Sequence, residues 1–249
     1  SDIFDNQFES PMTNQTHFYT LPNGLTVHLK EIHTAPIISS WVWYKVGSRN
    51  EHRGITGGSH WVEHMQFKGT DKFAAGYLDR EISRVGGIWN AMTYLDWTTY
   101  FQTLPANMAE LSLSLEADRM VNSRYLTEEV NTERSVIISE REGNENEPHF
   151  LLNEAIQEAA FDQHPYHFEV IGLKEDLETI TRDQLYAHYQ QFYDPANAVL
   201  ALAGDFEMDE MVAKVAANFG GIPTKGFVPQ TIPVRSEERR VGKECRSRW

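Results

Sequence analysis

The stretch His60-Trp61-Val62-Glu63-His64 decides how the rest of this chain is interpreted. On an α-helix, positions i and i+4 lie one above the other on the same face, so the imidazoles of His60 and His64 would project side by side. Two neutral imidazoles suit Zn²⁺, which binds nitrogen and oxygen ligands at about 2.0 to 2.2 Å. A catalytic zinc site also needs one more protein ligand and a coordination position left open for water. The stretch therefore predicts a metal site on a helix, with the Glu63 carboxylate beside it.

The residues around this pattern bear on whether it is a metal site or a solvated helix face. Histidine and glutamate are common on exposed helices, so the five residues alone leave both interpretations open. The segment is strongly apolar, with bulky side chains at Trp61, Val62, Met65 and Phe67. A buried histidine or glutamate needs a partner, because an unpaired polar group in the interior costs free energy. The apolar setting therefore favours a set of polar side chains that share a ligand.

Length and composition limit the class of protein. The chain has 249 residues, enough for one large domain or two small ones with a sizeable core. No run approaches the roughly 18 apolar residues of a membrane span. Residues 1–10 lack the basic start and apolar centre of a signal peptide, although a chain that begins without Met could have lost a targeting segment. We expect a soluble protein without a membrane segment, and its compartment stays open.

The last fifteen residues, 235–249 (RSEERRVGKECRSRW), differ from the rest of the chain. They contain nine charged residues and the only cysteine, Cys245. They resemble a translated sequencing-adapter oligonucleotide, so we expect a non-native tail; the alternative is a natural basic tail. Without the six basic and three acidic residues of this tail, the formal net charge falls from −14 to −17. Such an acidic surface argues against a nucleic-acid partner and mildly favours cationic ligands.

Strand and helix patterns alternate irregularly along the remaining chain. Residues 17–30 alternate apolar and polar side chains around Pro22-Asn23-Gly24, which predicts a β-hairpin. Residues 37–46 are rich in β-branched and aromatic side chains and predict a central strand. We expect further strands at 88–94, 98–104 and 198–203, and helices at 75–85, 105–123, 127–142, 149–161, 181–192 and 208–219. Because there is no strict βαβ rhythm and no solenoid repeat, we predict an α+β fold with a mixed or antiparallel sheet flanked by helices.

The helix expected near 126–142 offers a third metal ligand. At helical spacing, one stripe of this helix consists of Leu126, Val130, Glu133, Ile137 and Glu140. Two carboxylates therefore interrupt a face that should be buried, and they require a counter-charge. A zinc ion bound by His60, His64 and Glu140 would supply it. The alternative pairs Glu140 with Arg134 or Arg141 on the surface, and spacing alone does not decide between the two.

A resemblance to a known family extends this interpretation. Residues 58–70, GSHWVEHMQFKGT, resemble the active-site stretch of the pitrilysin/insulinase family, which includes the mitochondrial processing peptidases and many bacterial relatives. The H-x-x-E-H order is the inverzincin signature, the reverse of H-E-x-x-H. Residues 133–140, ERSVIISE, resemble the family's second acidic segment, and residues 90–93, NAMT, resemble its N-A-x-T strand. Trp61 and Gln66 stand where Phe and Leu are more usual, and neither changes the metal chemistry.

The resemblance implies a zinc metalloendopeptidase and assigns roles to individual residues. The metal ligands for one Zn²⁺ per chain would be His60, His64 and Glu140. Glu63 would act as general base, and Glu133 would support the zinc site electrostatically from beyond the ligands. A peptide substrate would pair with an exposed strand edge by β-augmentation. The substrate-binding residues on that strand would be Asn90, Ala91 and Thr93.

The resemblance also implies a domain organisation. Members of the family close a chamber from two related halves, and this chain would be the first. We expect residues 1–223 to form an N-terminal catalytic domain, residues 224–234 to begin a linker to a second domain, and residues 235–249 to be the non-native tail. The expected partners are a peptide substrate and either the missing C-terminal half or a homologous partner subunit. We expect neither nucleic acid nor membrane as a partner, and little activity from the chain alone.

Two other functions compete with this prediction. The first is a non-catalytic subunit that binds peptides or scaffolds a complex on the same fold. Such relatives typically lose metal ligands, whereas this chain keeps His60, Glu63, His64 and Glu140. The second is a small-molecule zinc hydrolase or lyase that shares the inverted motif. The long downstream match to the peptidase pattern makes the second competitor weaker still.

Overall fold

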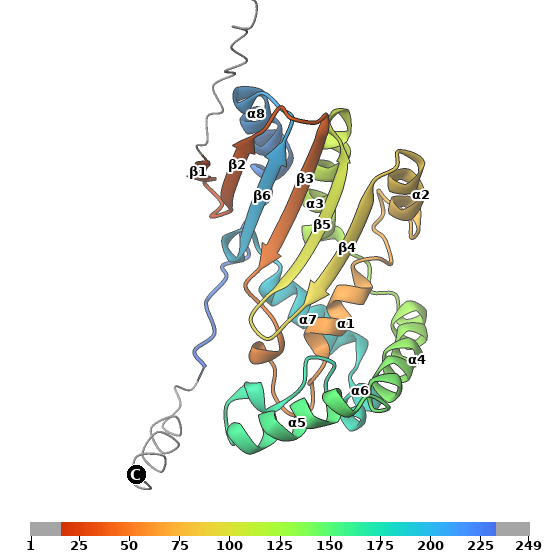
Figure 1. Cartoon of the computed structure of the whole chain (residues 1–249). Helices are drawn as coiled ribbons and strands as arrows, with labels where there is room; N and C mark the ends of the chain where they lie inside the picture. Colours follow the sequence, from red (N-terminus) through yellow and green to blue (C-terminus); the bar gives the residue numbers. More distant parts are fainter. Residues whose placement is uncertain (1–15, 233–249) are drawn as a thin grey trace, which may run out of the picture.

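The computed structural model describes residues 16–232, so the predicted tail at 235–249 lies outside the described residues. Within them a six-stranded sheet has helices on one face and at one end (Figure 1). The strands are β1 (His17–Thr20), β2 (Thr26–Glu31), β3 (Ile37–Tyr44), β4 (Ile88–Thr93), β5 (Thr98–Pro105) and β6 (Ala198–Gly204). Their order is β1-β2-β6-β3-β5-β4. The predicted α+β class is therefore confirmed.

The sheet is mixed because one pair of neighbours is parallel. β2 and β6 run parallel, whereas the pairs β1–β2, β6–β3, β3–β5 and β5–β4 are antiparallel. The hairpin predicted at 17–30 is the β1–β2 pair. The strand predicted as central, β3, lies between β6 and β5. β4 ends the order, so one of its backbone edges has no strand beside it among the described residues.

The helices have bounds close to those predicted. They are α1 (Gly58–Met65), α2 (Tyr77–Arg84), α3 (Ala109–Asn122), α4 (Thr127–Asn144), α5 (Pro148–Ala160), α6 (Lys174–Thr179), α7 (Arg182–Phe192) and α8 (Met208–Phe219). Four 3₁₀ turns join them at η1 (Ser48–Asn50), η2 (Ala106–Met108), η3 (Pro165–His167) and η4 (Pro195–Asn197). The sequence analysis missed α6, because six residues are too few to show a helical period.

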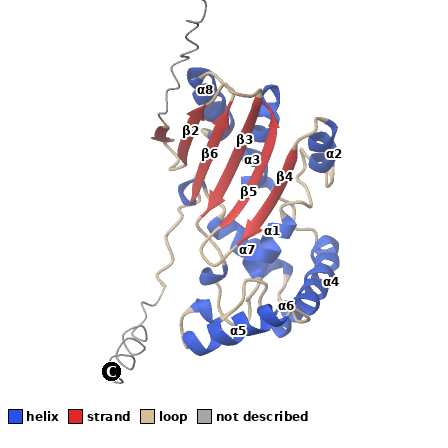
Figure 2. Cartoon of the chain, in the orientation of Figure 1, coloured by secondary structure: helices blue, strands red, loops and turns tan. Residues whose placement is uncertain are grey.

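The hydrophobic core lies between the sheet and the helices behind it. Alternate residues of β3 and β6, such as Val42 and Leu200, are fully buried because successive strand side chains point to opposite faces. α3 and α8 cover this face, as Figure 2 shows, with side chains such as Leu113 and Val215 in the core. At the lower end of the view, α1 lies between β4 and the layer formed by α4, α6 and α7. This arrangement places α1 beside the free edge of the sheet.

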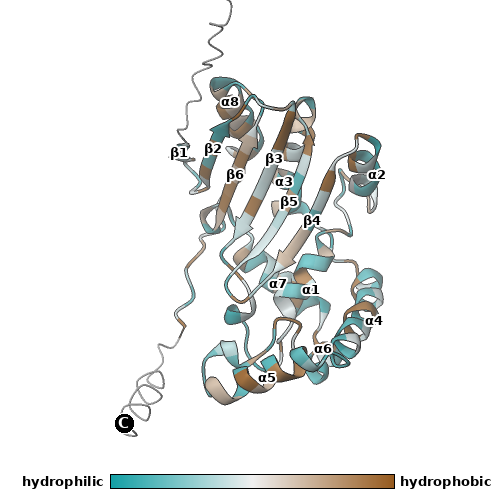
Figure 3. Ribbon diagram, viewed as in Figure 1, coloured by the Kyte–Doolittle hydropathy of each residue, from teal (hydrophilic) through white to brown (hydrophobic). Residues whose placement is uncertain are grey.

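The opposite face of the sheet carries apolar side chains although no described helix covers it. Trp41 stacks on Trp43 with 5.7 Å between ring centroids and on Phe101 with 4.1 Å. Ile37 and Ile88, on the same face, are 47% and 64% exposed. Figure 3 shows hydrophobic residues along β3 and β6. Antiparallel sheets with one solvated face usually show polar residues there, so this face resembles one that another protein layer covers.

None of the described helices is long and apolar enough to cross a membrane.

Candidate metal centre

Helix α1 begins at a tightly held turn. Both oxygens of the buried Glu51 carboxylate accept hydrogen bonds from backbone N–H groups at the start of α1. The donors are Gly57 at 2.7 Å and Ser59 at 2.6 Å. These groups have no partner within the helix, so an acidic side chain satisfies them and complements the helix dipole. The buried Asp176 accepts hydrogen bonds from Gly54 and Thr56 just before the helix. The two carboxylates fix where α1 starts.

Glycine is required where the chain passes this turn. Gly57 has a φ of +83°, and a Cβ there would lie 2.4 Å from the carbonyl oxygen of Ile171. Gly172 has the same φ, and its Cβ would lie 2.4 Å from the backbone nitrogen of Gly57. The two backbones therefore approach more closely than any residue with a side chain permits. This contact joins α1 to the loop before α6.

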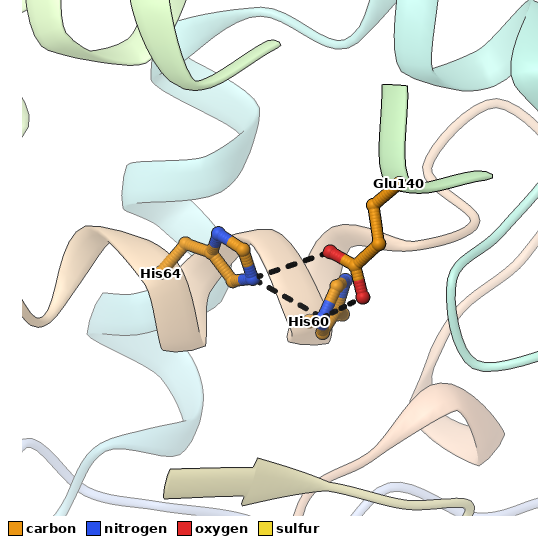
Figure 4. A group of neighbouring side chains, drawn as sticks. All are labelled: His60, His64 and Glu140. Carbon is orange, nitrogen blue, oxygen red and sulfur yellow. Dashed lines mark hydrogen bonds and ion pairs between the residues drawn. The ribbon is translucent and has the colours of Figure 1, made fainter. Parts of the chain in front are cut away.

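The two histidines of α1 present the same nitrogen to the same space. The Nε2 atoms of His60 and His64 lie 3.2 Å apart, as Figure 4 shows. His60 is mostly buried, and its Nδ1 has no hydrogen-bond partner among residues 16–232. Burial, followed by the neighbouring charge of His64, lowers the pKa of His60 to about 3. The ring is therefore neutral at ordinary pH, as a metal ligand must be.

Glu140 approaches both rings from α4. Its Oε1 lies 3.8 Å from His60 Nε2, and its Oε2 lies 3.8 Å from His64 Nε2 (Figure 4). Two ligand atoms about 2.1 Å from one tetrahedral ion lie roughly 3.4 Å apart. Separations of 3.2 to 3.8 Å need shifts of only a few tenths of an ångström to hold an ion. We call His60, His64 and Glu140 the metal centre, and its donor set fits Zn²⁺.

The setting of Glu140 corrects one step of the sequence argument. Its side chain is 42% exposed, so it does not lie on the fully buried face that the stripe predicted. Val130 and Ile137 occupy that face, and Glu140 lies at its margin, where it meets the imidazoles. The alternative arginine partners bond elsewhere: Arg134 donates to the carbonyl of Ile180, and Arg141 pairs with Glu145 and Glu154.

Glu133 fixes the ring of His64. Its Oε1 lies 2.7 Å from His64 Nδ1, which leaves Nε2 of that ring facing Glu140. The other carboxylate oxygen pairs with Lys68. The hydrogen bond with His64, with the help of Lys68, lowers the pKa of Glu133 to about 2 despite its burial. An ionised carboxylate on the far nitrogen is the usual support of a metal-binding histidine, so its position fits the supporting role predicted for it.

Glu63 is held from a different element. Its side chain is largely buried, and its Oε2 accepts a hydrogen bond of 2.5 Å from the hydroxyl of Thr93. Burial raises the pKa of Glu63, and the hydrogen bond from Thr93 opposes that rise. The charge of His64 lowers the pKa of Glu63, and the charge of Glu140 raises it. A raised carboxyl pKa suits a group that must accept a proton near neutral pH.

The residues predicted to bind substrate lie on the edge strand. Asn90, Ala91 and Thr93 all belong to β4. Asn90 is exposed, and its side-chain oxygen accepts a hydrogen bond of 2.9 Å from the backbone N–H of Ala91. The structure thus brings the predicted strand next to the helix that carries the metal centre. Substrate binding by these three residues stays a prediction.

A second group of possible metal ligands lies far from this site. Glu31, His33 and Glu207, which we call the sheet-end group, lie where β2 ends and before α8 begins. His33 Nε2 lies 2.7 Å from Glu31 Oε1, and its Nδ1 lies 2.7 Å from Asp205 Oδ1. Nothing in the sequence analysis singled these residues out.

The sequence analysis also missed the residues that hold the site together. Lys68 lies beyond the end of α1 at Met65, so its contact with Glu133 follows from the fold and not from helical spacing. Glu51 and Asp176 gave no signal either, because neither belongs to a periodic pattern with α1. Asp176 bonds Gly54 and Thr56 from 122 and 120 residues away, whereas Glu51 bonds Gly57 and Ser59 from only 6 and 8 residues away, through a turn that shows no period.

Comparison with known proteins gives the family of this chain. Residues 26–173 match the family described as insulinase (peptidase family M16), and residues 179–247 match the M16 inactive domain. Zinc protease PqqE of Helicobacter pylori is 36% identical over 226 residues, which cover 90% of this chain and 51% of that protein. A probable mitochondrial-processing peptidase subunit beta of Arabidopsis thaliana is 32% identical, over 93% of this chain and 44% of its own length.

Solved structures agree with the sequence relatives. The crystal structure of a protease from Helicobacter pylori superposes with a TM-score of 0.82 at 31% identity, and covers 88% of this chain and 53% of that one. The chain therefore spans about half the length of the curated relatives it matches.

Proposed function

The chain belongs to the insulinase family of peptidases, family M16, and on that premise we propose that it is a zinc-dependent endopeptidase that hydrolyses peptides or unfolded segments. The observation that carries the proposal is the meeting of two imidazoles on α1 with a carboxylate from α4, beside Glu63. Relatives named zinc proteases support the choice of metal. We propose one Zn²⁺ per chain, held by His60, His64 and Glu140.

The chain's own residues supply the remaining chemistry. When bound, the zinc ion would lower the pKa of a water toward about 7 and polarise the scissile carbonyl. Glu63 accepts a proton from the attacking water and gives it to the leaving amine. Glu133 holds His64 so that its Nε2 faces the metal centre. Residues Asn90 and Ala91 of β4 align the peptide through backbone hydrogen bonds, which give affinity with modest sequence preference.

We further propose that activity needs a second protein half. The relatives are about twice as long as the chain, and the uncovered apolar face of the sheet, with Trp41 and Trp43, suits a covering domain. The proposed organisation is a catalytic domain over residues 1–223, a linker beginning at 224–234 and a non-native tail at 235–249. The second half, or a homologous partner subunit, would complete the substrate chamber. The isolated chain should bind zinc and cleave peptides weakly or not at all.

A fusion protein tests this proposal. The two-half form consists of this chain joined to the C-terminal half of the Helicobacter pylori zinc protease. We expect it to cleave fluorescein-labelled β-casein, an unfolded protein, much faster than the chain alone. Equal rates would contradict the need for a second half.

A substitution separates a protease from a scaffold. Glu63→Gln should reduce cleavage by at least about 100-fold and leave the zinc content unchanged. Glu110→Gln is the matched control, because Glu110 lies on α3 and bonds Asn218 on the surface. A two-half form that binds casein but contains no zinc and cleaves nothing would favour the alternative, a non-catalytic peptide-binding or scaffolding subunit.

A further inference from the structure

The Glu63 carboxylate depends on one side chain for its orientation. Glu63 has three side-chain torsions, and α1 fixes only where the side chain begins. Within residues 16–232, the hydroxyl of Thr93 makes the only hydrogen bond to this carboxylate, 2.5 Å from Oε2. Thr93 belongs to β4, thirty residues further along the chain. We propose that Thr93 is the positioning residue of the general base, an inference that rests on the proposed function.

The Thr93 hydroxyl is itself firmly placed. Thr93 is the last residue of β4 and pairs with Thr98, the first residue of β5. Thr98 is fully buried, and its hydroxyl donates to the carbonyl oxygen of Val46 at 2.9 Å. The two threonine hydroxyl oxygens lie 3.4 Å apart. Because a threonine is stiff at χ1, the end of the β4–β5 ladder holds the hydroxyl against Glu63.

This contact gives the two oxygens of Glu63 different tasks. Oε2 accepts from Thr93, so Oε1 takes the proton of the attacking water as the water oxygen bonds to the peptide carbon. The same proton then passes from Oε1 to the leaving nitrogen as the C–N bond breaks, and Glu63 ends as it began. A misplacement of about 1 Å in such a group can cost about 100-fold in rate. Thr93 keeps Oε1 in one place through both transfers.

The inference gives β4 two functions at once. Its free edge is the proposed binding site for the peptide backbone, and its final residue holds the base. A shift of β4 would therefore move substrate and base together. If the role of Thr93 were purely structural, its hydroxyl would stabilise the end of the β4–β5 pair, and removing that hydroxyl would leave kcat unchanged.

Variants of the two-half form distinguish these roles. Thr93→Val keeps the shape and removes the hydroxyl, whereas Thr93→Ser keeps the hydroxyl. We expect Thr93→Val to lower kcat on labelled β-casein by about 10- to 100-fold, with KM within about 3-fold of the wild type and an unchanged zinc content. Thr93→Ser should restore kcat to within about 3-fold of the wild type. Thr93→Ala repeats the loss of the hydroxyl in a smaller side chain, so a folding defect of one variant does not decide the result.

A matched control and two outcomes complete the test. Thr179→Val makes the same change at the end of α6, where the hydroxyl bonds the backbone carbonyls of Glu175 and Asp176 instead of Glu63, and should leave kcat unchanged. A wild-type kcat in zinc-loaded Thr93→Val, or a Thr93→Ser variant as slow as Thr93→Val, would overturn the inference and leave the proposed function standing. An inactive wild-type two-half form that binds zinc would instead contradict the proposed function.

Discussion

The metal centre and the sheet-end group meet the same geometric condition, but we propose a zinc ion only for the metal centre. In each, the candidate ligand atoms all lie within 4.8 Å of one another. In each, a second carboxylate lies 2.7 Å from the Nδ1 of a histidine: Glu133 beside His64, and Asp205 beside His33. Proximity of histidine and carboxylate therefore does not distinguish a metal site from an ion-pair cluster.

The two groups differ in whether one of their histidines is protonated at neutral pH. Burial lowers the pKa of His60 to about 3, so its ring is neutral and ready to bind a metal. The hydrogen bonds that its ring donates to Asp205 and Glu31 raise the pKa of the exposed His33 to about 9, so the ring is charged at neutral pH. A metal must displace this proton before it binds. The burial of His60 separates the two groups, because Glu133 raises the pKa of His64 despite its burial, as Asp205 and Glu31 raise that of His33.

The largest expected effect is the loss of zinc from the metal centre. Glu140→Ala removes the carboxylate of the proposed ligand set and should weaken zinc binding by more than about 100-fold, because a metal site depends on its full ligand set. Glu207→Ala makes the same change in the sheet-end group and should leave zinc content unchanged. Zinc per chain, measured by atomic absorption after dialysis, tests both variants. Loss of zinc in Glu207→Ala alone would reverse the assignment of the two groups.

The next effect tests burial at a histidine that binds no metal. His188 on α7 is buried against α1, with Nε2 3.0 Å from the hydroxyl of Ser59, and burial lowers its pKa to about 4. The unfolded chain, with a histidine pKa near 6.5, then binds the proton first. The contribution of His188 to the free energy of unfolding is therefore fully present above pH 6.5 and falls by about 3 kcal/mol as the pH drops to 4. Urea unfolding at pH 7 and pH 4.5 measures this loss.

A variant of His188 provides the control for that measurement. His188→Gln keeps a polar group near Ser59 but does not titrate. Its free energy of unfolding should depend less steeply on pH between 6.5 and 4 than that of the wild type. Identical slopes for the two proteins would show that His188 is protonated as readily in the folded state as in the unfolded one.

A smaller effect is expected from Glu133, whose carboxylate contacts Nδ1 of His64. Glu133→Gln keeps the shape of the side chain but removes the charge that faces His64 and Lys68. Outer partners of metal ligands typically contribute about 10- to 100-fold to metal affinity, so zinc should bind more weakly by that factor. Competition with a zinc chelator measures the affinity. The control is Glu142→Gln, on the same helix as Glu133. It removes a surface ion pair with Lys174 and should bind zinc like the wild type.

The sequence predicted that His60, His64 and Glu140 lie together, because helical spacing pairs the two histidines and the family resemblance selects Glu140. Zinc binding by the three stays a prediction. His60 and His64 lie one helical turn apart, and Glu140 lies on a helix whose stripe drew attention to it. The strands and helices followed from alternation and helical spacing, and most bounds agree within a few residues. The edge position of β4 came from the resemblance, and the strand order now confirms it.

The parts that the sequence did not predict follow no local period, and most of them are made by distant contacts. Glu51, Asp176 and Gly172 hold the start of α1, but no period links them to it. The exposure of Glu140 was also unpredicted, because a stripe gives the face of a helix and not how far a neighbour covers it. The Thr93 hydroxyl bond to Glu63 joins a helix to a strand edge whose relative position only the fold determines.

The smallest expected effect bears most directly on the comparison of the two groups. Because the pKa of His33 is raised above its unfolded value, the stability it contributes is fully present below pH 6.5 and is lost as the pH rises through about 9. An NMR titration of the His33 ring should give a midpoint near 9. Asp205→Asn should lower this midpoint more than Glu31→Gln, because the hydrogen bond with Asp205 raises the pKa most.

If His33 titrated near pH 6.5, its protonation would no longer distinguish the sheet-end group from the metal centre. The ring would then be neutral at physiological pH and could offer Nε2 to a metal, with Glu31 and Glu207 as further ligands. The sheet-end group would satisfy the same chemical condition as the metal centre, and burial would no longer separate them. A midpoint near 9 means that the ring is protonated at neutral pH. The positive charge of this imidazolium then balances the carboxylates of Asp205 and Glu31, as a bound metal cation would.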